Sequence, residues 1–107
     1  MEKEEDNFTS LDKVIADLDD TGSYFLNVFN SKGMDMGILR LREGEKDTQI
    51  PHSVDEVYFV VKGDGYIEIE GKLKPVNSAD FIFIPANVSH RFVVGGKDLV
   101  VIYFFAS

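Results

Sequence analysis

A single stripe of apolar residues with helical spacing precedes Gly22 and predicts one short helix. Thr9 or Ser10 can cap its first turn with a side-chain oxygen, and Asp19 and Gly22 favour its end. We expect this helix to pack on the body of the fold. The stripe consists of Leu11, Val14, Ile15 and Leu18.

After Gly22 the apolar residues alternate with polar ones, and turns rich in Gly, Asn, Asp and Ser separate the short runs. Many short strands at regular spacing are typical of an all-β sandwich or barrel. No helical pattern follows Gly22, so the sequence excludes βαβ folds. Strands are expected at residues 24–30, 36–42, 56–62, 65–70, 72–76, 81–84, 90–94 and 99–105.

The chain shows no internal repeat and no linker, so we expect one domain. Residues 1–22 would form an acidic tail, from Met1 to Asn7, and the short helix, while residues 23–107 would form the barrel. Pro75 cannot donate a hydrogen bond to a neighbouring strand. It therefore predicts an edge strand or a bulge.

Composition narrows the classes of partner. The 107 residues carry a net charge of −8 with a pI near 4.6, which disfavours nucleic acids and anionic membranes. The chain has no cysteine, which excludes disulfides and thiolate chemistry. No secretory signal is visible before Asn7, and no apolar run is long enough for a transmembrane helix. We expect a soluble cytoplasmic protein.

The candidate chemistry rests on the two histidines of the chain, His52 and His90, together with Glu56. In a strand His52 and Glu56 would share a face, and a closed barrel can bring His90 to them. Two imidazoles and one carboxylate with open positions suit Fe, Mn, Ni or Zn as a divalent ion. Taken alone, the spacing equally allows two ordinary hydrogen-bonded histidines.

The residues around these positions resemble the two motifs of the cupin superfamily. The first motif, G-x5-H-x-H-x3,4-E-x6-G, matches at Gly44, His52, Glu56 and Gly63. The second, G-x5-P-x-G-x2-H-x3-N, matches at Pro85 and His90. The resemblance covers about half of the chain. It implies a cupin double-stranded β-helix, or jelly-roll barrel, and places both histidines at metal-ligand positions.

The chain departs from these motifs at four positions. Ile50 replaces the first histidine and cannot bind a metal, so the usual three-His, one-Glu set is reduced to His52, Glu56 and His90. Asn87 replaces a glycine, which is a mild change because Asn tolerates the left-handed conformation. The other two replacements are Ala79 for a glycine and Val94 for the terminal Asn.

Gln49 is a candidate fourth ligand. It neighbours Ile50, so regular strand alternation would point it outward, but Pro51 interrupts the strand and a bulge can turn a side chain inward. Some cupin sugar isomerases use a glutamine in this way. The alternative is a polar residue at the edge of a strand.

Other residues have two interpretations each. Either Phe81 and Phe83 or Ile82 and Ile84 fill the barrel, since alternate residues share a face. A pair of arginines on one strand face, Arg40 and Arg42, can bind a carboxylate substrate or form a solvated surface. We expect Tyr58 to line the cavity, and Asp55 to face away from Glu56 and bind arginine or backbone groups.

A cupin barrel does not determine a function. Three functions remain open: a metal-dependent enzyme, oxygenase-like or isomerase-like, acting on a small organic molecule; a non-catalytic module that binds a metal or a small ligand; and a structural role with a degenerate site. A homodimer is expected, because small cupins are often dimers. The last strand, with Tyr103, Phe104 and Phe105, carries more aromatic residues than one core can take.

Overall fold

The structure is a computed structural model that describes residues 7–106. The predicted acidic tail, Met1 to Asn7, therefore lies outside the described residues except for Asn7. The predicted helix is present as α2 (Leu11–Thr21), which Ser10 caps by accepting a hydrogen bond from the Lys13 amide at 3.2 Å. Gly22 ends the helix in the left-handed conformation, with φ of 72°.

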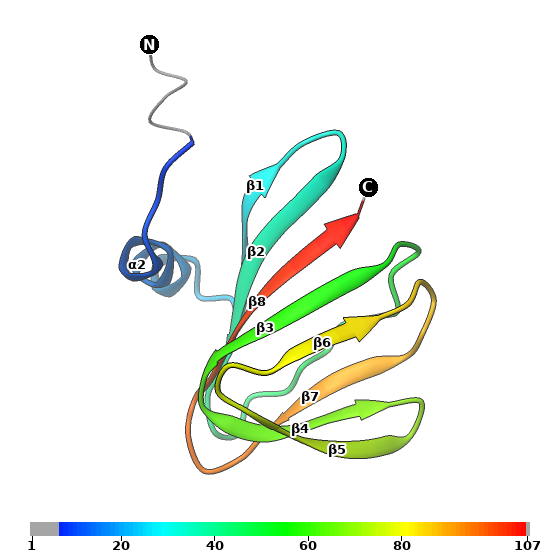
Figure 1. The fold of residues 1–107 in the computed structure, drawn as a ribbon. Helices are drawn as coiled ribbons and strands as arrows, with labels where there is room; N and C mark the ends of the chain where they lie inside the picture. The colour runs from blue at the N-terminus through cyan, green and yellow to red at the C-terminus, as the bar shows by residue number, and fades with distance from the viewer. Residues whose placement is uncertain (1–6, 107) are drawn as a thin grey trace.

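Two antiparallel sheets face each other in Figure 1. The five-stranded sheet has the order β1-β2-β8-β3-β6 and the three-stranded sheet the order β5-β4-β7. All eight predicted strands are present, and their ends differ from the predicted ends by at most two residues. The strands are β1 (Phe25–Asn30), β2 (Met34–Leu41), β3 (Glu56–Lys62), β4 (Asp64–Ile69), β5 (Lys72–Asn77), β6 (Phe81–Ile84), β7 (His90–Val94) and β8 (Leu99–Ala106).

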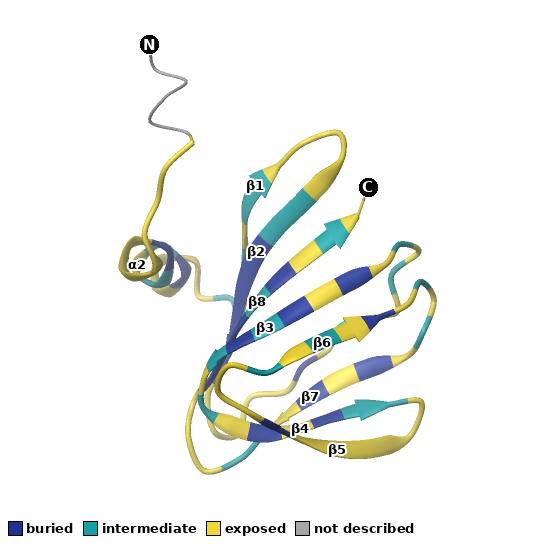
Figure 2. Ribbon diagram, in the orientation of Figure 1, coloured by how far each residue is buried: buried dark blue, intermediate teal, exposed yellow. Residues whose placement is uncertain are grey.

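The main core lies between the two sheets. Leu39 and Tyr58 of the larger sheet meet Ile67 and Phe92 of the smaller one, and all four are buried. Burial alternates along β3 and β4, as the period of two predicts (Figure 2).

Strand β6 resolves one of the two alternatives left by the sequence. Ile84 is buried in the core and Ile82 packs against it, whereas Phe81 is 75% exposed and Phe83 59% exposed. The isoleucines therefore fill the barrel, and the phenylalanines lie on its outer face.

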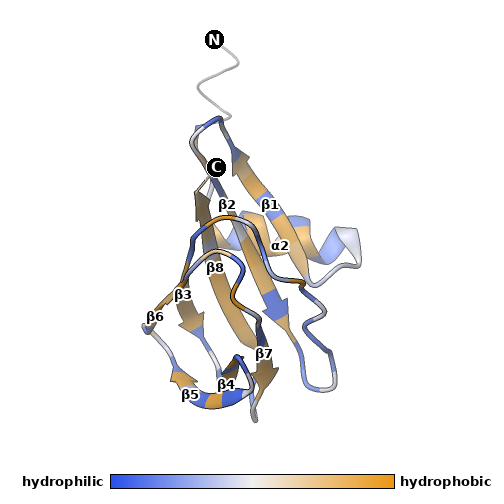
Figure 3. Ribbon diagram, turned by 90° about the vertical axis from the view of Figure 1, so that its right-hand side faces the viewer, coloured by the Kyte–Doolittle hydropathy of each residue, from blue (hydrophilic) through white to orange (hydrophobic). Residues whose placement is uncertain are grey.

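The helix covers part of the outer face of the larger sheet (Figure 3). Val14 and Leu18 pack against Ile38 and Val100 in a second, smaller core. This contact confirms that the helix packs on the body of the fold.

Arg40 also points to this outer side, where its guanidinium lies 2.6 Å from Asp19 of α2, and Arg42 lies 3.3 Å from the same carboxylate. Both arginines thus bind a carboxylate of the protein itself, not one of a substrate. A role for them in holding a substrate is not supported.

A backbone hydrogen bond between two turns helps to bring the site together. Asn87 has φ of 67°, as expected for a residue that replaces a glycine, and its amide donates to the carbonyl of His52 at 2.7 Å. This bond ties the turn between β6 and β7 to the segment that precedes β3.

Pro75 lies in β5, at the edge of the smaller sheet, which confirms the predicted edge strand.

Among residues 7–106, no helix has the length and apolar character needed to cross a membrane. The cytoplasmic location stays a prediction.

Candidate metal centre

The three candidate ligands come from different parts of the chain and meet between the sheets. Glu56 begins β3 in the larger sheet, and His90 begins β7 in the smaller one. His52 lies in the irregular segment between β2 and β3, so strand alternation, which the sequence interpretation used, is not what orients it. One ligand atom from each residue lies within 4.8 Å of the other two.

Glu56 is a buried carboxylate with an unusual environment. It is 2% exposed, and neither of its oxygens accepts a hydrogen bond from the described residues. The closest charged partner is His90, whose Nε2 lies 3.2 Å from Oε1. Burying a carboxylate without donors is costly, and a bound cation would remove that cost. The donor set therefore fits a divalent metal ion.

His90 is oriented by the backbone. Its Nδ1–H donates a hydrogen bond to the carbonyl oxygen of Val88 at 2.9 Å, which leaves Nε2 facing Glu56. Burial lowers the pKa of His90, but the nearby Glu56 carboxylate and the hydrogen bond to Val88 outweigh it, so the pKa lies above its usual value. A carbonyl on one ring nitrogen is the usual arrangement of a metal-binding histidine.

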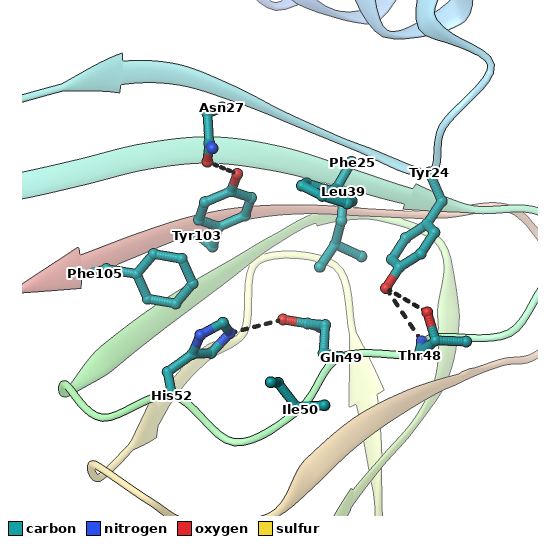
Figure 4. Close-up of a pocket in the computed structure, with 10 residues that line it drawn as sticks. All are labelled: Tyr24, Phe25, Asn27, Leu39, Thr48, Gln49, Ile50, His52, Tyr103 and Phe105. Atoms are coloured by element: carbon teal, nitrogen blue, oxygen red, sulfur yellow. Dashed lines mark hydrogen bonds between the residues drawn. The ribbon is translucent and has the colours of Figure 1, made fainter.

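His52 lies at the edge of a cavity that Gln49 and Phe105 also line (Figure 4). Its ring packs on Phe105 of β8, with 4.4 Å between the ring centres, and it lies 6.1 Å from the ring of His90. Its Nε2 is 3.4 Å from Oε1 of Gln49. Its partial exposure makes it the ligand that a bound molecule would meet first.

Gln49 turns its side chain toward the site. Its amide nitrogen donates to Asp47 Oδ2 at 2.9 Å, so its oxygen faces His52 and the Tyr58 hydroxyl, which donates to it at 3.2 Å. The irregular backbone between β2 and β3 permits this orientation. The edge-residue alternative is thus not observed, and whether Gln49 binds metal stays a prediction.

Asp47 is the residue that sequence reasoning missed. It is 6% exposed and accepts hydrogen bonds from the Phe92 amide at 2.8 Å and from Gln49. It therefore fixes both the segment before His52 and the direction of the Gln49 amide. A lone aspartate between Lys46 and Thr48 gave no signal of burial.

Tyr58 is buried beside the candidate ligands and, contrary to the prediction, is not among the residues that line the cavity. Its hydrogen bonds were not foreseen. Its hydroxyl lies 2.9 Å from His90 Nε2. Burial, and after it the negative charge of Glu56, raises the pKa of Tyr58 far above its usual value. The phenol thus stays protonated and remains a hydrogen-bond donor.

Asp55 faces away from Glu56, and its carboxylate accepts a hydrogen bond from the Ala86 amide at 2.9 Å, as expected.

A cavity of about 370 Å³ opens beside His52 and Gln49 (Figure 4). Tyr103 and Phe105 of the last strand turn inward to line it, while Phe104 between them faces outward. The last strand thus divides its aromatic residues between the two faces. The cavity is lined by Tyr24, Phe25, Asn27, Leu39, Thr48, Gln49, Ile50, His52, Tyr103 and Phe105.

Comparison with protein families gives a match to the family described as the cupin domain, over residues 37–105. The chain belongs to the cupin family. This cupin is 32% identical to the uncharacterized protein SCO3923 of Streptomyces coelicolor over 96 residues, which are 90% of this chain and 91% of that one.

Solved structures share the fold. KdgF from Halomonas sp. superposes with a TM-score of 0.69 at 23% identity, over 77% of this chain and 76% of that chain. An RmlC-like cupin from Methanocaldococcus jannaschii, described as a double-stranded β-helix, gives a TM-score of 0.71 at 14% identity over 77% of each chain. The predicted double-stranded β-helix with one short helix is therefore confirmed.

Proposed function

We propose that this cupin holds one divalent metal ion through His52, Glu56 and His90, with the Gln49 oxygen as a fourth ligand. The observation that carries the proposal is the Glu56 carboxylate, which is buried, accepts no hydrogen bond from residues 7–106 and faces His90. Nitrogen and oxygen donors in this number suit Fe, Mn, Ni or Zn as the ion.

We further propose that the site acts on a small organic molecule by oxygenase-like or isomerase-like chemistry. A divalent ion supplies a Lewis acid or a centre for oxygen chemistry. The residues of the chain supply the rest: the Tyr58 hydroxyl offers a hydrogen bond beside the ligands, Asp47 orients Gln49, and the cavity receives the molecule at His52.

Elemental analysis of untagged protein, purified without chelators, tests the metal site. We expect about one metal ion per chain in the wild type and a loss of at least about 90% of it in His90→Ala, because a 2-His-1-carboxylate set does not survive removal of a ligand. Arg91→Ala is the matched control, since Arg91 lies next to His90 but pairs with Glu68 on the outside. Equal metal content in the wild type and in His90→Ala would contradict the proposal.

A non-catalytic binding module is the second candidate, and the loss of a ligand position at Ile50 favours it. The two candidates differ in turnover. Saturable binding of a small molecule with no product, under air and with each of the four metals, would support the module and reject the enzyme.

We also propose a homodimer, formed through the outer face of the larger sheet. The register aligns Phe104 of β8, Val57 of β3 and Phe83 of β6 in one row, and Phe81 packs on Phe59 beside it. Exposed aromatic side chains grouped on an edge strand are typical of a contact between subunits. The helix leaves this part of the face uncovered (Figure 2).

Sedimentation velocity at micromolar concentration tests the dimer. We expect the wild type to sediment as a dimer and the double variant Phe81→Lys, Phe83→Lys as a monomer, because two buried charges oppose the contact. Leu73→Lys on the other sheet, at a residue that is 58% exposed, should leave the dimer intact. A monomeric wild type would reject the proposal.

A further inference from the structure

The cavity beside the metal centre has walls of one chemical character. Four of its ten lining residues are aromatic, and none is Lys, Arg, Asp or Glu. The uncharged polar groups are already paired: the Tyr103 hydroxyl donates to Asn27, and Tyr24 bonds Thr48. An incoming molecule thus meets mainly aromatic and aliphatic surface, with the polar groups of Gln49 and His52 at one end (Figure 4).

The mouth of the cavity is apolar as well. Ile50 is 74% exposed and Phe25 is 46% exposed, and both line it. Ile50 stands at the position where the cupin motif has its first histidine. One replacement has therefore removed a metal ligand and added an apolar edge to the opening.

The surrounding charges disfavour an anion. The adjoining hollow shares Asn27, His52 and Phe105 with the cavity and adds the carboxylate of Asp35. The arginines of the neighbouring strand are held by Asp19 on the far side of the sheet. A phosphate that enters loses part of its hydration and finds no lysine or arginine among the lining residues to pair with.

We infer that the cavity selects an uncharged aromatic molecule of one or two rings, and that it rejects phosphorylated sugars. The ring would lie between Phe25, Tyr103 and Phe105, where aromatic contacts add to the gain from burial. A single polar group would point to Gln49 and the metal. A volume of about 370 Å³ suits this size, because a cavity of roughly 150 Å³ already holds benzene.

The inference rests on the proposed function, because it names the class of molecule that would reach the metal. Its test uses indole, which is aromatic, uncharged and a poor metal ligand, against glucose 6-phosphate. The chain has no tryptophan, so indole fluorescence can be followed without interference. Both probes are titrated into metal-free and metal-loaded protein, and metal content is measured separately.

We expect indole to bind metal-free wild-type protein with a dissociation constant below about 1 mM, and glucose 6-phosphate to bind at least about tenfold more weakly. Ile50→Lys should weaken indole about threefold or more and tighten glucose 6-phosphate by a similar factor, because it places a cation at the mouth. Leu73→Lys adds the same charge at an exposed apolar position in β5. It should change neither the affinity for indole nor the affinity for glucose 6-phosphate.

Tighter binding of glucose 6-phosphate than of indole by the wild type would overturn the inference, as would equal effects of Ile50→Lys and Leu73→Lys. Binding of indole by a protein that never loads metal would support the inference and reject the proposed function. Metal loading without indole binding would reject the inference and support the proposed metal site.

Discussion

Replacing Glu56 by glutamine is expected to lower metal affinity at least about a hundredfold, because it removes the only carboxylate of the ligand set. The amide keeps the size and shape of the side chain, so the protein should still fold. Competition with a fluorescent chelator measures the affinity. Glu68→Gln is the control, since Glu68 pairs with Arg91 at the surface and lies outside the site.

The same substitution should have the opposite effect on the metal-free protein. Because the pKa of His90 is raised in the fold, its pairing with Glu56 stabilises the protein fully below pH 6.5, the ordinary pKa, and is lost as the pH rises through the folded value. As the pH rises toward about 9, fewer His90 side chains carry a proton, so the Glu56 carboxylate loses its cationic partner. There we expect metal-free Glu56→Gln to be about 1–2 kcal/mol more stable than the wild type.

Urea denaturation at about pH 9 and about pH 6 tests the sign, because the advantage of Glu56→Gln should shrink or reverse at the lower pH. Unchanged metal affinity in Glu56→Gln would remove Glu56 from the ligand set. A metal-free variant that is less stable than the wild type at the higher pH would show that the buried carboxylate is not an unsatisfied charge.

Replacing Gly37 by alanine is expected to destabilise the protein by about 3 kcal/mol. Gly37 lies in β2 between Asn27 of β1 and Tyr103 of β8, and the Tyr103 ring crosses it to donate to Asn27. An added methyl group would overlap both the Tyr103 ring and the carbonyl oxygen of Leu26. The carbonyl belongs to the backbone, so the contact cannot be relieved by a rotamer change alone.

Gly33→Ala is the matched control for Gly37→Ala. Gly33 lies in the turn of the same hairpin, and a methyl group there meets nothing within 4 Å. It should change the free energy of unfolding by no more than about 0.5 kcal/mol. Because Tyr103 lines the cavity, Gly37→Ala should also weaken indole binding. Equal stability of the two variants would mean that the Tyr103 ring does not depend on Gly37.

The elements of the fold were readable from the sequence because their signals are local. The helix has a cap, a stripe and a terminating glycine, and each strand has a period of two between turn residues. The motif positions His52, Glu56 and His90 were also identified, and the fold brings them together. Family membership added the pairing of strands that periodicity alone does not supply.

The sequence left open every question that depended on which face of a strand meets the core. Ile82 and Ile84 face inward and Phe81 and Phe83 outward, although both pairs alternate equally well. Arg40 forms an ion pair with Asp19 because the helix packs on the outside of β2.

The ordering of the site also lay beyond the sequence. His52 is held by a bond from Asn87, 35 residues later in the chain, and Gln49 is turned inward by the buried Asp47. Such contacts join an irregular segment to distant turns, and no periodicity encodes them.

By itself, then, the sequence determined the helix, the strands, the cupin family and the residue types available to a metal, because these follow from local spacing and motif. Only the tertiary structure decided which side chains line the cavity and that Glu56 is buried without a donor. Those properties arise when two sheets close on each other and remove water from groups far apart in the chain.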